Sequence, residues 1–390
     1  MQALGRQLVC SSNSRAGVSI IHKVTKQSSQ KIQHHQQNSR VFSFPHRRAF
    51  SSTSSVSGGL LHHEWVIGGN VINDTNSANS RDDTNTVVFL HGLLGSGKNL
   101  RTLSKKITER NPNLSALLLD LRGHGSTSTN ASFSSTTEPP HTFESCANDI
   151  INTLQNLNLV GSERSPVAVV GHSFGGRLAL QYAHQTIIHN QNRLSSDGGT
   201  LQQIPHPPLH TWILDSVPGQ AHASVHDVIQ AVSSVDLPIP SKKHLQTVLT
   251  KEKGIDPMIA AWMTTNLRKS SCNKGFTYTF DLDVAMSVLN EFGKQDFLGM
   301  IRDVGKIHHL DYDKESMEKE KKNGRINLVM AGKNPSWTED LKKELELIQS
   351  DLVSKEESFL QMYKLPEAGH WVHVDDLEGL IQVIEKGGLH

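Results

Sequence analysis

One serine of this chain has the neighbours that a nucleophile needs. Ser173 lies in the G-x-S-x-G pattern of residues 171–175, between the apolar residues 167–170 and the helix-forming residues 177–181. A strand that turns sharply into a helix holds one residue in a strained conformation, and the flanking glycines remove the side chains that would collide there. The pattern therefore predicts a nucleophile elbow. Phe174 would open the helix, so its backbone N–H would be available to bind an oxyanion.

Two further groups for acyl-transfer chemistry follow from chain order. The strand-like residues 86–90 lead into His91-Gly92-Leu93, and the loop after such a strand supplies a second oxyanion donor, for which Leu93 N–H is the candidate. The general base should follow the last strand, and His370, next to Gly369, fits that place. The chain has 22 histidines, and four others near strand ends do not fit the order of a base, so we expect them to shape loops: His91, His124, His172 and His373.

The acid that would orient His370 is less specified by the sequence. The usual loop, residues 331–337, contains no carboxylate. Two acids follow it but are better explained as charges that favour a helix N-terminus, Glu339 and Asp340. One strand earlier stands Asp215, which we predict to orient His370 and stabilise its imidazolium, with an auxiliary hydrogen bond from Ser336. The alternative is that Asp215 only caps a loop.

Residues 92–98 also spell G-x-x-x-x-G-K, the pattern of a phosphate-binding loop. Such a loop needs a Ser or Thr hydroxyl for Mg²⁺ at the next position, where this chain has Asn99. A nucleotide site would also leave the elbow at Ser173 without a role, so we favour an oxyanion loop. Asp120 and Arg122, which follow the next strand, are expected to hold the loops beneath the site.

Strand-like and helix-like segments alternate from about residue 60. This alternation predicts an α/β fold with a mostly parallel, twisted sheet covered by helices on both faces, and reactive groups at the carboxyl ends of its strands. The predicted strands are residues 65–67 with 71–72, 86–90, 116–119, 167–170, 211–214, 326–330 and 359–363. We expect the core in residues 60–218 and 325–388, and an inserted helical lid with a charged linker in residues 219–324.

The first 50 residues differ from the rest in composition. They contain eight Lys and Arg and no acidic residue, which is typical of an organelle transit peptide, and Arg48-Ala49-Phe50-Ser51 resembles a mitochondrial processing site. We expect import into a mitochondrion, with the matrix as the compartment and a plastid as the lesser alternative; a disordered basic tail is the other interpretation. Without those eight cations, 31 Lys and Arg face 38 acidic residues, a net charge of −7 that removes electrostatic support for nucleic-acid binding.

The apolar runs are strand-sized, so no transmembrane segment is expected. Cys146 and Cys272 are far apart in the sequence, so we expect no disulfide framework and no C-x-x-C metal site.

Together these motifs resemble the α/β-hydrolase fold superfamily, and within it the abhydrolase domain-containing proteins and their bacterial esterase relatives. The resemblance covers about residues 62–388 and is carried by the segments 91–101, 120–125, 171–175 and 369–373. It implies hydrolysis of esters or thioesters, a mitochondrial location and no cofactor. It also implies a second candidate acid, because Asp283 lies in a lid motif from which the family's acid has been drawn. On strand-end position we prefer Asp215.

The sequence therefore predicts a serine hydrolase acting on small acyl esters or thioesters of short to medium chain length, with Ser173, Asp215 and His370 as catalytic residues and no metal. A serine nucleophile argues against epoxide hydrolysis and dehalogenation, which need a carboxylate in its place. The alternative from a different class is a non-catalytic protein that binds a ligand or a partner on a hydrolase fold.

Overall fold

The computed structural model describes residues 60–72, 84–129, 140–161, 163–194, 204–271, 274–310, 324–351 and 359–390. The chain divides near residue 55, and all described residues belong to its second part. The predicted transit segment and its processing site lie outside them.

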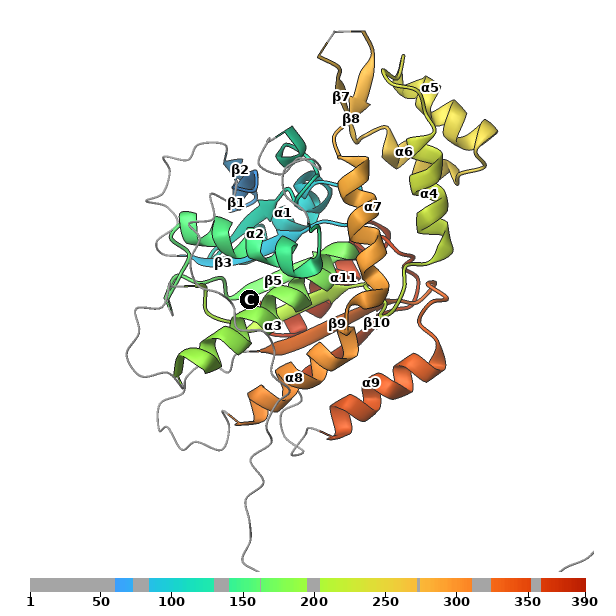
Figure 1. The fold of residues 1–390 in the computed structure, drawn as a ribbon. Coiled ribbons are helices and arrows are strands. Elements are labelled where there is room, and N and C mark those ends of the chain that lie inside the picture. Colours follow the sequence, from blue (N-terminus) through green and yellow to red (C-terminus); the bar gives the residue numbers. More distant parts are fainter. Residues whose placement is uncertain are drawn as a thin grey trace, which may run out of the picture. The chain divides into compact units, whose positions relative to one another are not determined.

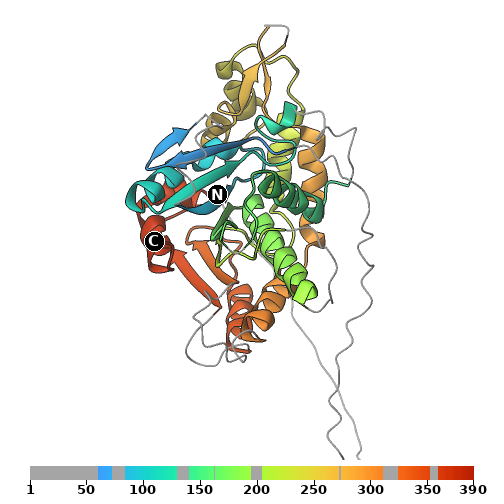
Figure 2. The ribbon, with the colours of Figure 1, turned by 90° about the vertical axis from the view of Figure 1, so that its left-hand side faces the viewer.

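An eight-stranded sheet forms the centre of this part, in the order β10-β9-β6-β5-β3-β4-β1-β2. The strands from β10 to β4 are parallel, while β1 pairs antiparallel with both β4 and β2. Each predicted strand is present, within about two residues of its expected ends. The bounds are β1 His63–Ile67, β2 Asn70–Ile72, β3 Asn85–Leu90, β4 Leu114–Leu119, β5 Ala168–His172, β6 His210–Leu214, β9 Arg325–Ala331 and β10 Leu360–Leu365. In Figure 2 the blue strands at one end and the orange strands at the other point in different directions, as the twist of a long sheet requires.

Apolar side chains cover both faces of the central strands, which is why these strands are continuous hydrophobic runs. In β3, Val87 and Phe89 pack beneath α1 (Arg101–Arg110) and α11 (Leu377–Lys386). Val88 and Leu90 face the other way, toward α2 (Phe143–Asn156) and α3 (Phe174–Leu194). On this second face, α8 (Phe297–Leu310) and α9 (Glu339–Asp351) cover the end of the sheet that holds β6, β9 and β10.

The segment between β6 and β9 holds the predicted lid. It contains α4 (Ala223–Ser233), α5 (Lys242–Thr247), α6 (Pro257–Met263) and α7 (Leu282–Glu291). It also contains two elements that the sequence did not predict, the antiparallel pair β7 (Leu267–Lys269) and β8 (Phe276–Tyr278). Helix α8 falls inside the predicted lid range, yet its buried side chains pack under the sheet with those of α3 and α9. Among the described residues, no helix combines the length and apolar character needed to cross a bilayer.

Candidate active site

Ser173 lies at the turn between β5 and α3, near the middle of the sheet. Its φ is 54°, a left-handed conformation that costs a non-glycine residue free energy. A Cβ at position 171 would overlap the backbone of Gly175, and one at position 175 would overlap the backbone of Leu90. The glycines of the motif are therefore required by close packing of this turn. The Ser216 hydroxyl donates to the Ser173 carbonyl and holds the turn from the next strand.

The structure brings His370 and Asp215 to this serine. Ser173 Oγ lies 3.1 Å from His370 Nε2, and His370 Nδ1 lies 2.7 Å from Asp215 Oδ2. A carboxylate accepts the Nδ1 proton, so Nε2 is left without a hydrogen and can accept the serine proton. Ser173 and Asp215 directly follow β5 and β6, and His370 lies in the loop after β10. These segments are far apart in the chain and meet at the carboxyl edge of the sheet.

Asp215 is buried, and three neutral donors surround it in addition to His370. Ala331 N–H and Trp337 Nε1–H donate to Oδ1 at 3.0 and 2.6 Å, and Asn334 Nδ2 donates to Oδ2 at 2.8 Å. Burial alone would raise the pKa of Asp215, but the hydrogen bonds from His370, Trp337 and Ala331 outweigh it and hold the pKa below its usual value. Asp215 therefore stays ionised beside His370.

The predicted hydrogen bond from Ser336 to Asp215 was wrong. Ser336 N–H donates instead to Asn334 Oδ1, and Asn334 reaches the carboxylate. The sequence offered little signal for Asn334 and Trp337, because amide and indole side chains in a loop have many roles. The other candidate acid, Asp283, lies exposed in the first turn of α7, and its backbone N–H binds Asp281.

Most backbone N–H groups of the loop after β3 donate hydrogen bonds within the loop or to neighbouring segments of the chain. The amides of residues 94–97 donate in turn to His124 Nε2, Gly92 O, Asn99 Oδ1 and Asp120 Oδ1, at 2.7 to 3.1 Å. The Leu93 N–H donates to no acceptor among the described residues, and neither does the Phe174 N–H at the start of α3. A phosphate-binding loop needs several such amides at once, so this loop does not match one.

Two buried histidines fix the orientation of that loop. His91 Nε2 accepts from Leu121 N–H at 3.0 Å, so its protonated Nδ1 donates to Gly92 O at 2.8 Å. The Gly92 carbonyl and the Leu93 N–H belong to one planar peptide unit. The hydrogen bond from His91 to this carbonyl therefore also fixes the direction of the Leu93 N–H. His124 acts likewise: its Nδ1 donates to Arg122 O, and its Nε2 holds Leu94, whose φ is 63°. Burial lowers the pKa of His91, and that of His124 to about 3, so both rings stay neutral.

A third neutral imidazole supports the loop that carries His370. His172 Nε2 donates to the His370 carbonyl at 2.7 Å, and the two rings lie 4.9 Å apart between centroids. His373 packs edge-on against His172 at 4.6 Å. Burial keeps the pKa of His172 well below its usual value and lowers that of His373 to about 4. The histidines that did not fit the place of a base thus shape the loops, as the sequence predicts.

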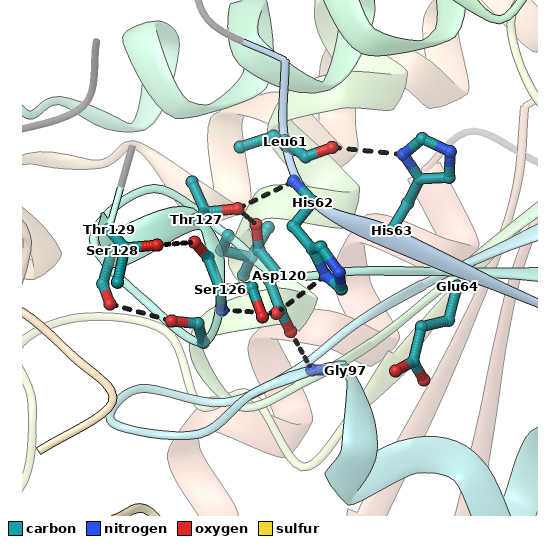
Figure 3. Close-up of polar contacts among 12 residues, drawn as sticks. Leu61, His62, His63, Glu64, Gly97, Asp120, Ser126, Thr127, Ser128 and Thr129 are labelled. Atoms are coloured by element: carbon teal, nitrogen blue, oxygen red, sulfur yellow. Dashed lines mark hydrogen bonds and ion pairs between the residues drawn. The ribbon is translucent and has the colours of Figure 1, made fainter. Parts of the chain in front are cut away.

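Asp120 connects the loop after β3 to neighbouring segments of the chain (Figure 3). Its carboxylate accepts from Gly97 N–H at 2.8 Å and Ser126 N–H at 2.7 Å, and it pairs with His62 Nδ1 at 3.1 Å. Burial raises the pKa of Asp120, but these partners outweigh it and hold the pKa at about 2. Arg122 forms a separate buried pair with Asp149. Both residues therefore hold loops beneath the site.

Arg177, one turn after Ser173 on α3, is a contributor that the sequence did not predict. Its guanidinium donates to the carbonyls of Val217 and Gly219, where the chain enters the insertion, and to that of Phe292, where it leaves. Burial lowers the pKa of Arg177 to about 10, which leaves it charged at neutral pH. One buried cation thus connects both ends of the segment 217–292 to helix α3, which begins directly after Ser173.

The described residues contain no group of three or more His, Cys, Asp or Glu side chains that could hold a metal ion. The geometry of the site is a hydrogen-bonded series of Ser173, His370 and Asp215 on a mostly parallel α/β sheet, with the Leu93 and Phe174 amides free of acceptors among the described residues. Proteins of this class are α/β-hydrolases. The chain belongs to the Alpha/beta hydrolase family, whose model matches residues 87–383.

The chain is similar to two relatives that carry the name sn-1-specific diacylglycerol lipase ABHD11. The Danio rerio protein is 24% identical over 202 residues, which are 50% of this chain and 54% of that protein. The Mus musculus protein is 35% identical over 99 residues, which are 25% of this chain and 28% of that protein. The matched part of this chain thus spans about half of the first relative and less of the second.

Solved structures share the fold at low sequence identity. A marine microorganism esterase has a TM-score of 0.55 at 17% identity, covering 84% of this chain and 98% of that one. The enzyme E-2-(acetamidomethylene)succinate hydrolase has a TM-score of 0.53 at 14% identity, covering 78% and 91%. These similarities establish the α/β-hydrolase fold.

Proposed function

We propose that this protein is a serine hydrolase that cleaves carboxylic ester or thioester bonds of small acyl substrates through an acyl-enzyme intermediate. The observation that carries the proposal is the relay from Ser173 Oγ to His370 Nε2 at 3.1 Å and from His370 Nδ1 to Asp215 at 2.7 Å. A nucleophile and its base within hydrogen-bond reach, with the base oriented by a third group, are the requirements for activating a hydroxyl.

In the proposed reaction, Ser173 Oγ attacks the substrate carbonyl while His370 Nε2 takes the hydroxyl proton. Asp215 keeps the Nδ1 proton in place and stabilises the imidazolium. The Leu93 and Phe174 N–H groups, which have no acceptor within the described residues, bind the oxygen on which negative charge develops. His370 then gives the proton to the leaving alcohol or thiol. In the second half of the reaction His370 takes a proton from water, the water oxygen attacks the acyl-enzyme, and His370 returns the proton to Ser173 Oγ as the acid leaves.

Family membership supports hydrolysis, and the names of the relatives favour acyl esters of glycerol within the proposed substrate class. An acyl-ester panel should therefore include monoacyl- and diacylglycerols beside simple aryl esters and acyl thioesters. The expected order is ester turnover above amide turnover, because the alcohol leaves more readily than an amine.

Active-site labelling with a fluorophosphonate tests the proposal directly. We expect the wild-type chain to be labelled and Ser173→Ala to lose both the label and ester turnover, down to a residual rate roughly 10³-fold above water. Ser224→Ala is the matched control. Its hydroxyl also contacts a histidine, His222, at 2.8 Å, but it is exposed on α4 and has no elbow. Unchanged turnover in folded Ser173→Ala would place the nucleophile elsewhere.

We also propose that the protein acts in mitochondria, on the basis of the acid-free, Arg-rich first 50 residues. N-terminal sequencing of the endogenous protein should find a mature start near Ser51. A start at Met1 together with a cytosolic signal from a C-terminal fusion would contradict this location.

A further inference from the structure

The lid carries a concentration of positive charge at its tip. We define the lid tip as residues 237–280, which include α5, α6, β7 and β8 and gather at one end of the fold in both ribbon views (Figures 1 and 2). It contains seven cations and two acidic residues, a formal charge of +5. The whole chain carries +1 and its first 50 residues carry +8, so the residues outside these two segments sum to −12. The cations are Lys242, Lys243, Lys251, Lys253, Arg268, Lys269 and Lys274.

The six lysines of the tip are all exposed, and no ion pair among the described residues includes any of them. Arg268 is the exception among the cations, since it donates to Ser128. Elsewhere in the described chain, five of the ten lysines form ion pairs with carboxylates, namely Lys106, Lys294, Lys306, Lys333 and Lys342. The lysines of the tip are therefore presented to solvent outside any ion pair of the described residues.

Large apolar side chains are exposed within this basic surface. Leu237 is 53% exposed and Met258 is 62% exposed. The strand edge after Leu237 pairs with β8 through Ile239 and Phe276, which brings Leu237 close to the turn that holds Lys274. Met258 lies in the first turn of α6, shortly after Lys251 and Lys253. Apolar groups that project among lysines suit a surface that is both anionic and apolar below its charges.

An anionic lipid bilayer has this chemistry, because acidic headgroups attract lysines and the region beneath them accepts apolar side chains. A nucleic acid would use the lysines but would leave Leu237 and Met258 without a role. We propose that the lid tip docks on an anionic lipid bilayer, with the lysines at the headgroups and Leu237 and Met258 inserted between them.

Docking at the tip would bring the membrane surface close to the catalytic loop. Trp262 of α6 packs on Trp371 with ring centroids 5.8 Å apart, and Trp371 follows His370 directly. An acyl ester held in the bilayer would then have a short path to Ser173. This step rests on the proposed function, and it narrows the substrate class to esters that partition into membranes.

Vesicle flotation with the full chain tests the docking. The background is Ser173→Ala, so that no lipid is consumed, and the vesicles are phosphatidylcholine with or without phosphatidylglycerol. The tip variant is Lys242→Gln, Lys243→Gln, Lys251→Gln and Lys253→Gln. The matched control removes four exposed lysines of the body, Lys106→Gln, Lys333→Gln, Lys343→Gln and Lys364→Gln. The first 50 residues are basic in every variant, so the difference between variants is the readout.

We expect the tip variant to lose roughly tenfold or more of its affinity for anionic vesicles, and the body variant to lose no more than about twofold. Binding of the parent should weaken at high salt and be low on pure phosphatidylcholine. A second variant, Leu237→Ser with Met258→Ser, keeps the charge and should also weaken binding severalfold. Equal binding by the tip and body variants would overturn the proposal.

Other results would identify a binding partner of the lid tip other than a bilayer, or would separate bilayer docking from ester hydrolysis. If the lysine changes weaken binding to vesicles and to heparin alike while Leu237→Ser with Met258→Ser changes neither, the tip binds a polyanionic macromolecule and bilayer docking is wrong. In the active enzyme, the tip variant should keep its turnover of a water-soluble ester and lose turnover of a vesicle-borne ester. A chain that binds vesicles but hydrolyses no ester would contradict the proposed function and leave the docking intact.

Discussion

The carboxyl edge of the sheet and the lid tip differ in the burial and pairing of their polar side chains. At the sheet edge, Asp215, Asp120 and the ring of His124 are buried, and each carboxylate oxygen or ring nitrogen has a partner. At the lid tip, six lysines are exposed and lack ion-pair partners among the described residues. The first arrangement fixes positions, and the second leaves charge available for something outside the chain.

This difference fits two separate roles within one fold, namely holding reacting groups rigidly and binding an external surface. Leu94, Ser173 and Asp215 all have positive φ, and such strain persists only where surrounding contacts determine the conformation. Reaction geometry needs that rigidity, because small displacements of a catalytic group cost large factors in rate. A docking surface needs long, solvated side chains that adapt to a fluid partner. We therefore expect substitutions at the carboxyl edge of the sheet to change catalysis and stability, and substitutions of exposed residues to change them little.

The largest effect should come from the acid of the relay. We expect Asp215→Asn to lower kcat by roughly 10²-fold or more, since the amide cannot balance an imidazolium and can stabilise the wrong His370 tautomer. Asp283→Asn, in the exposed first turn of α7, should change kcat by less than about threefold. Steady-state kinetics on a water-soluble ester, with circular dichroism to check folding, give the ranking. The reverse ranking would move the acid into the lid.

A smaller effect is expected from a residue that only positions the site. His124→Leu leaves the buried Leu94 N–H without an acceptor, which should destabilise the fold by about 1–3 kcal/mol and lower kcat roughly tenfold through the oxyanion loop. The matched change at the tip is His244→Leu, an exposed histidine of α5, which should affect neither quantity. If His124→Leu lowers stability but leaves kcat and KM unchanged, the loop does not depend on His124 for its catalytic geometry.

A still smaller effect should follow from removing Lys98, which ends the phosphate-loop pattern and is exposed. Because the loop amides are used inside the protein, Lys98→Ala should keep kcat within about threefold, as expected for a distant charge screened over roughly 8 Å. ATP or GTP with Mg²⁺ should not raise Tm, since a ligand stabilises only a state that it binds. A concentration-dependent rise that Lys98→Ala abolishes would establish nucleotide binding after all.

The smallest predicted effect concerns the pair of half-exposed His62 and buried Asp120. The hydrogen bond with Asp120 raises the pKa of His62, so the stabilisation is complete below its ordinary value of 6.5 and is lost as pH rises through the folded-state pKa. Asp120, with a pKa of about 2, stays ionised throughout this window. His62→Gln keeps a donor without a titrating charge. Its Tm deficit should be roughly a degree or two larger at about pH 5.5 than at about pH 8.5. A deficit that grows with pH would contradict the pairing.

Local sequence was a good guide to the sheet and to the elbow. The strands and the helices α1, α2, α3, α9 and α11 follow from apolar runs and spacing that a single segment contains. Asp215 was selected over Asp283 because strand ends meet at one edge of a parallel sheet. Helix α8 and the pair β7 and β8 were not predicted, since their patterns are short or ambiguous until they pack against α3 and the neighbouring lid segment.

By itself, the sequence predicted Ser173 and His370 as site residues and their order along the chain, because the G-x-S-x-G turn and the strand-end histidine are local features constrained by backbone sterics. It also determined the charge of the lid tip. Only the tertiary structure decided which side chains surround Asp215, that Arg177 binds both ends of the lid, and that Trp262 meets Trp371. Those contacts join segments separated by tens to more than a hundred residues. Their partners are selected by packing and by the need to satisfy buried polar groups, and no pattern within one segment records that selection.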